Sequence, residues 1–123
     1  MSHQIESSLQ AEKSLLDIAV ESWRFSRLFG KVVGQLEAGT SSRYINQLRY
    51  FQKKIEETLD TNGFKFVNVE GQLYDPGMAA SALNIGDFAT DDVLMVEQML
   101  EPIIMGPNGL YKEGTVMLRK VEQ

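Results

Sequence analysis

The sequence contains no cysteine and only one histidine, His3, and these shortages exclude several kinds of chemistry. Without thiols, the chain has no disulfide, no cysteine nucleophile and no thiolate metal site. His3 lies three residues from the start, where we expect a tail residue rather than a catalytic base. Serine–histidine hydrolysis and histidine-ligated metal therefore have no candidate residues.

The sequence also lacks long apolar runs and any excess of positive charge. No segment approaches the roughly 18 apolar residues of a membrane span, and the first ten residues lack the layout of a signal peptide. The 17 acidic residues outnumber the 12 basic ones, for a net charge of −5, and no run of one sign stands out. We therefore expect a cytoplasmic protein that binds neither nucleic acid nor a membrane.

The first third of the chain has apolar residues at helical spacing and no proline, which predicts one helix from about residue 4 to residue 38. Its apolar positions fall on two stripes. The first stripe contains Leu15, Ile18, Phe25, Phe29, Val32, Val33 and Leu36. The second contains Ile5, Leu9, Leu16, Val20 and Trp23, and Gly30 and Gly34 continue it. A break of the helix near Gly30 is the alternative.

A second helix is predicted over residues 42–61, because Gly39 suits a helix C-terminus and Thr40, Ser41 and Ser42 suit an N-cap. Its apolar residues form a single stripe of Tyr44, Leu48, Phe51, Ile55 and Leu59. The short connection predicts an antiparallel helical hairpin.

One stripe of the first helix would remain uncovered by this hairpin, and it contains residues too large to leave exposed. We therefore expect a second copy of the chain to cover it, which would give a twofold-symmetric four-helix bundle. The expected dimer interface consists of Leu9, Leu16, Val20, Trp23, Gly30 and Gly34.

After Gly63 the pattern changes to short apolar runs separated by turn residues, which predicts a small β-domain. The fold class expected is thus α+β, with a helical dimerisation region over 1–62 and a β-domain over 63–123. Strands are expected near residues 64–69, 80–85, 92–99, 102–106 and 114–121. Asn108–Gly109 favours a primed hairpin turn, and Pro102 favours a strand edge or bulge.

The segment Tyr74-Asp75-Pro76-Gly77 predicts a tight turn within this domain. Pro76 fixes φ at the first central position, and Gly77 can adopt the positive φ that a type II turn needs next. Asp75 can accept hydrogen bonds from the backbone that follows it.

Catalytic and metal-binding candidates in this domain are few. Asp91 and Asp92 suggest a magnesium site, but neighbours on a strand point to opposite faces, which favours a solvated loop. Glu97 and Glu101 would lie roughly 13 Å apart on a strand, too far for a carboxylate pair. The glycines of residues 106–109 lack the lysine and the helix of a phosphate-binding loop. We therefore expect neither an enzyme nor a cofactor.

The assembled pattern resembles the GrpE family of nucleotide exchange factors. Tyr74-Asp75-Pro76 is similar to the family's Phe-Asp-Pro turn, Asn108–Gly109 to its hairpin turn, and Thr115–Leu118 to its last strand. The likeness covers about residues 14–121. Ala79 stands where the family has histidine, and residues 111–114 replace its Leu-Arg-Pro-Ala segment.

The resemblance implies a homodimeric co-chaperone whose β-domain binds a DnaK-type chaperone ATPase and promotes ADP release. The residues it implies as partner contacts are Met105, Asn108, Leu110, Tyr111, Lys112 and Leu118. Because of the departures, an adaptor that binds a divergent ATPase without exchange activity is the alternative. An enzyme with a carboxylate metal site is a third, weaker interpretation.

Overall fold

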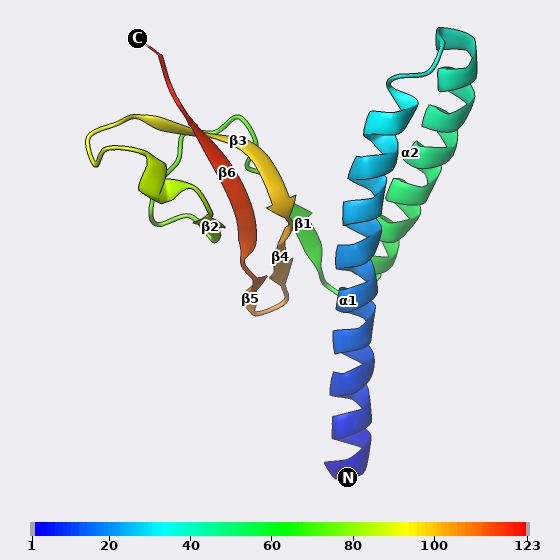
Figure 1. The fold of residues 1–123 in the computed structure, drawn as a ribbon. Helices are drawn as coiled ribbons and strands as arrows, with labels where there is room; N and C mark the ends of the chain where they lie inside the picture. The colour runs from blue at the N-terminus through cyan, green and yellow to red at the C-terminus, as the bar shows by residue number, and fades with distance from the viewer. Residues whose placement is uncertain (1, 123) are drawn as a thin grey trace. The chain divides into compact units, whose positions relative to one another are not determined.

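The structure, a computed structural model, describes residues 2–122 and is α+β, as the sequence predicts. The chain divides into two compact units, Met1–Leu59 and Asp60–Gln123, which we call the helical unit and the β-unit. Figure 1 shows two helices in the first and short strands in the second. Each unit is described by itself below.

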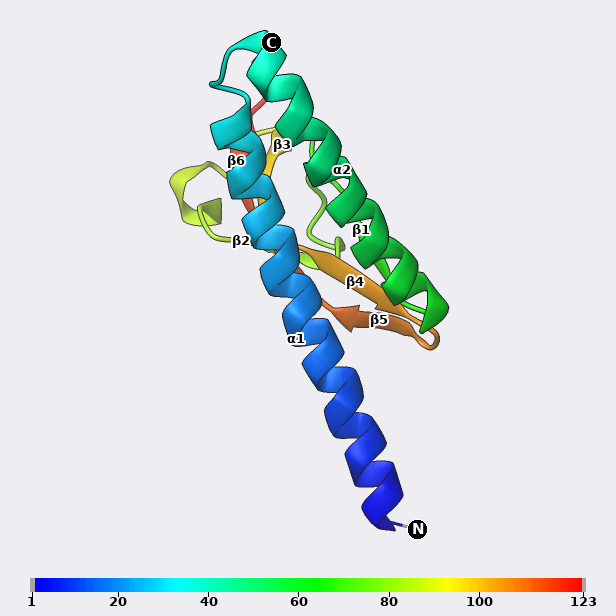
Figure 2. The same cartoon turned by 90° about the vertical axis from the view of Figure 1, so that its right-hand side faces the viewer.

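The helical unit contains α1, Ser2–Val33, and α2, Ala38–Thr61, which lie alongside each other in both views (Figures 1 and 2). The first helix therefore ends well before residue 38. After Val33 the backbone tightens into bonds between residues three apart, from Gln35 N–H to Val32 and from Leu36 N–H to Val33, both 3.1 Å. Such bonds end an α-helix, because they leave its regular hydrogen-bond ladder.

The second helix begins earlier than expected. Gly39 does not end a helix but lies inside the first turn of α2, so both the predicted C-terminus and the predicted N-caps are wrong. The Ser41 N–H donates to the Glu37 carbonyl at 2.7 Å, so Glu37 accepts the first helical bond. The Ser42 hydroxyl turns back to the Ala38 carbonyl at 3.0 Å instead of capping.

One buried line of α1 includes the small side chains of alanine and serine, and Leu16 and Val20, 3% and 9% exposed, are buried as well. Ala19, Ser26 and Val33, seven residues apart and so on one face, are 2%, 4% and 1% exposed. Beside this line, Gly30 lies against α2: a Cβ there would be 3.5 Å from Leu48 Cδ2. The contacts between the helices thus include Leu48 toward Gly30 and Tyr44 edge-on against Phe29 of the first stripe, with ring centroids 6.4 Å apart.

The β-unit contains two three-stranded sheets. Its strands are β1, Lys65–Val67; β2, Ala80–Ala82; β3, Leu94–Glu101; β4, Ile103–Gly106; β5, Gly109–Lys112; and β6, Gly114–Lys120. One sheet has the order β1-β4-β5 and is antiparallel. The other has the order β2-β6-β3, with β2 parallel and β3 antiparallel to β6.

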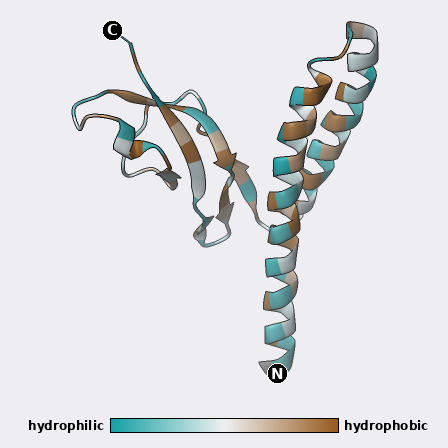
Figure 3. Cartoon of the chain, in the orientation of Figure 1, coloured by the Kyte–Doolittle hydropathy of each residue, from teal (hydrophilic) through white to brown (hydrophobic). Residues whose placement is uncertain are grey.

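The core of the β-unit comes from alternate residues of β3 and β6 together with β4. The buried side chains include Val96, Met99, Ile103, Ile104, Val116 and Leu118, each 2% exposed or less. Figure 3 shows these strands as mainly hydrophobic. Pro102 lies between β3 and β4, and the pairing of β3 with β6 shifts register between Met99 and Glu101. A bulge at this place accommodates a residue that cannot donate to the sheet.

Candidate partner-binding surface of the β-unit

The turn at residues 74–77 forms, but it is not the type II turn predicted. The Asp75 carboxylate accepts a bond from the Gly77 N–H at 2.9 Å, and the Met78 N–H bonds to the Asp75 carbonyl at 2.8 Å. Gly77 is not among the residues with positive φ, which are Gly63, Gly71 and Gly109. The carboxylate bond to Gly77 forms an Asx-type turn, which makes the left-handed conformation unnecessary.

The residues before this turn pair with the open edge of β3, a contact that the sequence did not suggest. The Tyr74 N–H donates to the Leu94 carbonyl at 2.8 Å, and Gly71 and Gln72 exchange bonds with Val96 at 2.8 and 2.9 Å. Leu73 forms a bridge with Met95. The turn therefore ends a short segment that protects an edge strand.

The hairpin between β4 and β5 carries most of the predicted contact residues. Gly109 has φ of +108°, whereas Asn108 does not have a positive φ. A type I′ turn needs positive φ at both central residues, so the prediction of a primed turn is wrong. Pro107 provides the reason, because its ring holds φ near −65° at a position where a primed turn needs the opposite sign.

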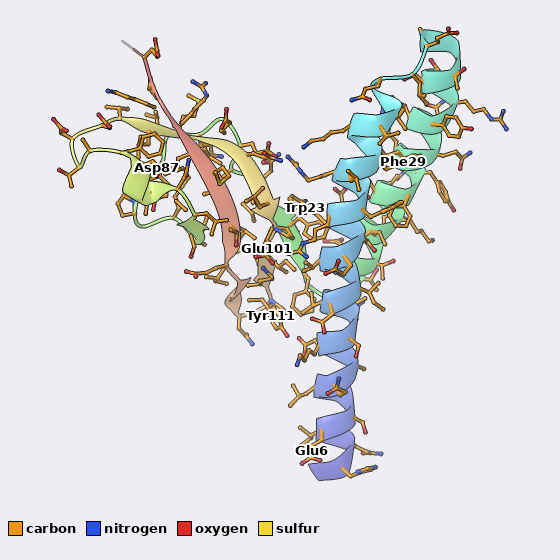
Figure 4. All side chains as sticks on the ribbon, in the orientation of Figure 1. Glu6, Trp23, Phe29, Asp87, Glu101 and Tyr111 are labelled. Carbon is orange, nitrogen blue, oxygen red and sulfur yellow. The ribbon has the colours of Figure 1, made fainter. Side chains whose placement is uncertain are left out.

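The apolar side chains of β5 are half exposed. Leu110 and Tyr111 are 48% and 47% exposed, and the Tyr111 ring meets Phe64 edge-on at 5.3 Å. Figure 4 shows Tyr111 on β5. Gly106 makes this packing possible, since a Cβ there would lie 3.0 Å from the Phe64 ring. Phe64 thereby supports Tyr111 in an orientation that a partner can reach.

Lys112 is not a freely available cation. Its ammonium lies 3.7 Å from one carboxylate oxygen of Glu101 and donates to the Glu113 carbonyl at 3.0 Å. The other Glu101 oxygen accepts a bond from the Thr115 hydroxyl at 2.8 Å. The lysine and the glutamate are each 31% exposed, and their link joins β5 of one sheet to β3 of the other.

The remaining predicted contacts differ in exposure. Met105 is half-buried and Asn108 is exposed at the hairpin tip. Leu118 is only 2% exposed and belongs to the core, so its prediction as a partner contact is wrong. Its backbone is held by Asn84, whose side chain bonds the Leu118 N–H at 2.9 Å and its carbonyl at 2.8 Å. The sequence reasoning missed Asn84, because an asparagine in a loop has no distinctive pattern.

The six residues predicted as a dimer interface have different environments. Leu16 and Val20 are 3% and 9% exposed, and Leu9 is 59% exposed. Trp23 is half-buried under the Arg27 guanidinium, whose carbon lies 4.8 Å from the ring centroid. Gly30 lies against α2, and Gly34 follows the end of α1. The homodimer itself stays a prediction.

Of the two aspartates considered for a magnesium site, Asp92 forms a hydrogen bond and an ion pair within the β-unit. Asp92 accepts a bond from the Ala89 N–H at 2.9 Å and pairs with the Lys120 ammonium at 3.3 Å. The bond from Ala89 and the nearby lysine lower the pKa of Asp92 below its ordinary value of 3.8, and partial desolvation opposes them. An open pocket of about 420 Å³ adjoins the pair and is lined by Asp91, Asp92, Val93, Lys120, Val121 and Glu122.

Within residues 2–122 no cluster of three or more potential ligands is arranged to hold a metal ion. His3 lies exposed in the first turn of α1. No helix in the same range is long and apolar enough to cross a membrane. Comparisons with protein-family models, curated proteins and solved structures found no match.

Proposed function

We propose that this chain is a GrpE-like co-chaperone that promotes ADP release from a DnaK-type chaperone ATPase. The observation that carries the proposal is the order of its elements. Two helices precede a six-stranded β-unit, and the Tyr74–Gly77 turn precedes β2. The Asn108–Gly109 turn joins β4 to β5, and β6 follows β5 in the sequence. The motifs of the resembled family occur in the same order.

The proposed mechanism is mechanical rather than chemical. The β-unit binds the open form of the chaperone's nucleotide-binding domain more tightly than the closed form. This difference in affinity shifts the domain toward the open state, from which ADP leaves. Accelerating release a thousandfold requires lowering the barrier by about 4 kcal/mol. A few well-placed contacts on a rigid surface can supply that difference.

The contacts that we assign to the chaperone lie on the β4–β5 hairpin. Leu110 and Tyr111 provide about half-exposed apolar surface, and Phe64 holds the Tyr111 ring. Asn108 and Met105 flank them. Aromatic and aliphatic side chains anchored in this way are typical of residues that dominate binding energy at interfaces. Lys112 contributes less than a free lysine would, because Glu101 already compensates its charge.

We also propose that α1 and α2 form an antiparallel hairpin that dimerises, through different residues from those predicted. Ile18, Phe25 and Val32, seven residues apart on α1, are 64%, 61% and 51% exposed. On α2, Tyr44 and Phe51 are 41% and 39% exposed. These five residues form what we call the apolar side.

Aromatic contacts connect the two halves of the apolar side. Phe29, labelled in Figure 4, stacks on Phe25 at 6.1 Å and meets Tyr44 edge-on at 6.4 Å, so the aromatic contacts continue from one helix to the other. Exposed apolar surface of this extent usually marks an interface. A second copy of the hairpin would complete the four-helix bundle.

Release of a fluorescent ADP analogue from a DnaK-type chaperone tests the proposed exchange activity. We expect substoichiometric protein to accelerate release, and we expect Tyr111→Ala to reduce the acceleration at least tenfold, because truncating an anchor residue costs about 2 kcal/mol of binding. Tyr50→Ala, which truncates a tyrosine on α2 that is 67% exposed against 47% for Tyr111, serves as the control and should leave the rate unchanged. Equal losses in both variants would exclude the hairpin as the contact.

An adaptor without exchange activity is the second candidate, and two observations favour it. Lys112 is neutralised by Glu101, and Leu118 is buried, so two of the six contacts implied by the resemblance are weakened or removed. Such an adaptor would bind its ATPase with the same affinity whether or not nucleotide is present. Binding without any change in ADP release would select it.

A further inference from the structure

The outer face of α2 is basic and carries an exposed tyrosine. From residue 38 to residue 55 the helix has four basic side chains, Arg43, Arg49, Lys53 and Lys54, and no acidic one, although the whole chain has a net charge of −5. Tyr50 is 67% exposed. Arg43 precedes it by seven residues and Lys54 follows it by four, so all three lie on one face, which we call the outer face of α2.

The outer face of α2 has no partner within the helical unit. Leu48, on the opposite side of the helix, packs toward Gly30 of α1. Arg43 and Lys54 form no ion pair among residues 2–122. An aromatic side chain between two unpaired cations has the composition of an interface centre, in which tyrosine and arginine are enriched.

A complementary surface lies in the β-unit of the same chain. Between Lys65 and Lys112 there is no basic residue, and the stretch contains the acidic residues Glu70, Asp75, Asp87, Asp91, Asp92, Glu97 and Glu101. Residues 83–93, which we call the acidic loop, combine this charge with aliphatic side chains. Leu83 and Ile85 are 65% and 47% exposed, and Asp87 and Asp91 are exposed beside them in sequence (Figure 4 labels Asp87).

The acidic loop is held at both ends. Near its start, Asn84 makes two hydrogen bonds to the Leu118 backbone, at 2.8 and 2.9 Å. Near its end, Asp92 bonds Ala89 and pairs with Lys120. Between them, the one-turn helix η1, Ile85–Asp87, closes with a bond from the Asp87 N–H to the Asn84 carbonyl at 3.0 Å. A loop fixed in this way loses little entropy when it binds.

We propose that the acidic loop of one copy docks on the outer face of α2 of another copy. Leu83 and Ile85 cover the Tyr50 ring, and Asp87 and Asp91 pair with Arg43 and Lys54. Each side brings an apolar centre and two charges of one sign, and the two signs are opposite. Because the two surfaces are different, the contact is heterologous. It is independent of the apolar side and of the proposed chaperone binding.

Sedimentation velocity of the full chain at low salt (about 20 mM NaCl) and high salt (about 400 mM) tests the contact. We expect a larger average mass at low salt and an apparent association constant about tenfold smaller at high salt, because salt screens exposed ion pairs. The apolar side behaves differently, because its association does not weaken with salt. A single species of unchanged mass in both buffers would overturn the proposal. That result would not decide whether the chain dimerises through the apolar side, which is tested separately.

Charge reversal identifies the surfaces. We expect R43E/K54E and D87K/D91K each to remove the salt-sensitive assembly when studied alone, since each brings like charges together. A one-to-one mixture of the two variants should restore it, because the reversed helix then meets the reversed loop. The control K13E/K31E changes the net charge by the same amount as R43E/K54E, but on α1, and should assemble like the unmodified chain. Failure of the mixture to assemble, with both variants folded by circular dichroism, would overturn the proposal.

Discussion

At the scale of single residues, the β-unit contains a glycine position, Gly114, where a side chain would not fit. Gly114 is buried at the start of β6, and a Cβ there would lie 2.8 Å from Ile103 Cγ1 and 2.9 Å from the Glu101 carbonyl. The second of these atoms belongs to the backbone, so the clash cannot be relieved by rotating a side chain. This close approach keeps Glu101 and Thr115 within hydrogen-bonding distance of each other.

We therefore predict that Gly114→Ala lowers the free energy of unfolding by about 2–3 kcal/mol, as overpacking of a tight site does. Urea unfolding followed by circular dichroism measures the change. Gly86→Ala is the matched control, because nothing lies within 4 Å of the added methyl group and φ is not positive there. A loss for Gly114→Ala no larger than for Gly86→Ala would contradict the account.

Asp92 gives the β-unit a dependence on acidity. Its pKa is lowered in the folded state, chiefly by the bond from Ala89 and also by Lys120, so the folded protein binds a proton here less readily than the unfolded chain does. The stabilisation is therefore complete above the unfolded value near 3.8 and is lost as the pH falls through the lower folded value. Asp92→Asn should flatten the fall in stability below about pH 4.

Urea unfolding of both proteins across that acidic range measures the effect of Asp92. Asp91→Asn is the natural control, because the neighbouring carboxylate is exposed and forms no ion pair among the described residues. If the free energy of unfolding of Asp92→Asn falls with decreasing pH as steeply as that of the unmodified protein, the carboxylate does not contribute to acid sensitivity.

At the scale of elements, the kinds and the order of the elements were predictable from the sequence, but the helix boundaries and the packing of the helices were not. The strands follow from alternating apolar residues between glycine and proline turns. Five of them, β1, β2, β3, β4 and β6, fall within or close to the expected runs, whereas β5 matches none of them. Gly34 directly follows the end of α1 but was assigned to the second stripe, and Gly39, which suggested an end, lies inside α2.

The covered face of α1 was missed for a physical reason. Hydrophobic periodicity weights large side chains, whereas the buried line contains Ala19 and Ser26, with Gly30 beside it. Gly30 allows Leu48 of α2 to come close to the backbone of α1, a contact that a search for large apolar side chains does not find. The candidate site was predictable only in part. The burial of Leu118 depends on strand register, and the compensated charge of Lys112 depends on its pairing with Glu101, and no local sequence pattern shows either.

Gly30 provides a test at this scale. A methyl group at this position would meet Leu48 at 3.5 Å, an ordinary contact distance. We predict that Gly30→Ala stabilises the chain by about 0.5–1 kcal/mol, because alanine has the better helix propensity and the space exists. Gly30→Leu, which must displace Leu48, should instead destabilise it. Thermal unfolding of the two variants measures the direction of each change in stability. Destabilisation by alanine would show that the two helices lie closer together at Gly30 than in the structure.

At the scale of the whole molecule, the apolar side predicts how copies associate. Phe25 lies on that side and is 61% exposed, and Leu9 is similarly exposed, at 59%, on the opposite face of α1. We predict that Phe25→Asp converts a dimer to a monomer in multi-angle light scattering at micromolar concentration, because burying an unpaired charge at an interface is costly. Leu9→Asp is the control and should remain dimeric. A monomeric unmodified protein would end the bundle proposal.

The central claim is that the β-unit distinguishes two states of a chaperone ATPase, and an equilibrium measurement tests it most directly. A β-unit that favours the open state of the ATPase domain lowers the affinity of that domain for ADP, and linkage then requires ADP to lower the affinity of the domain for the β-unit by the same factor. Calorimetric titration into each form gives the two affinities. The account predicts binding at least tenfold weaker with ADP present, and equal affinities in the two titrations would contradict the claim that the β-unit distinguishes the two states.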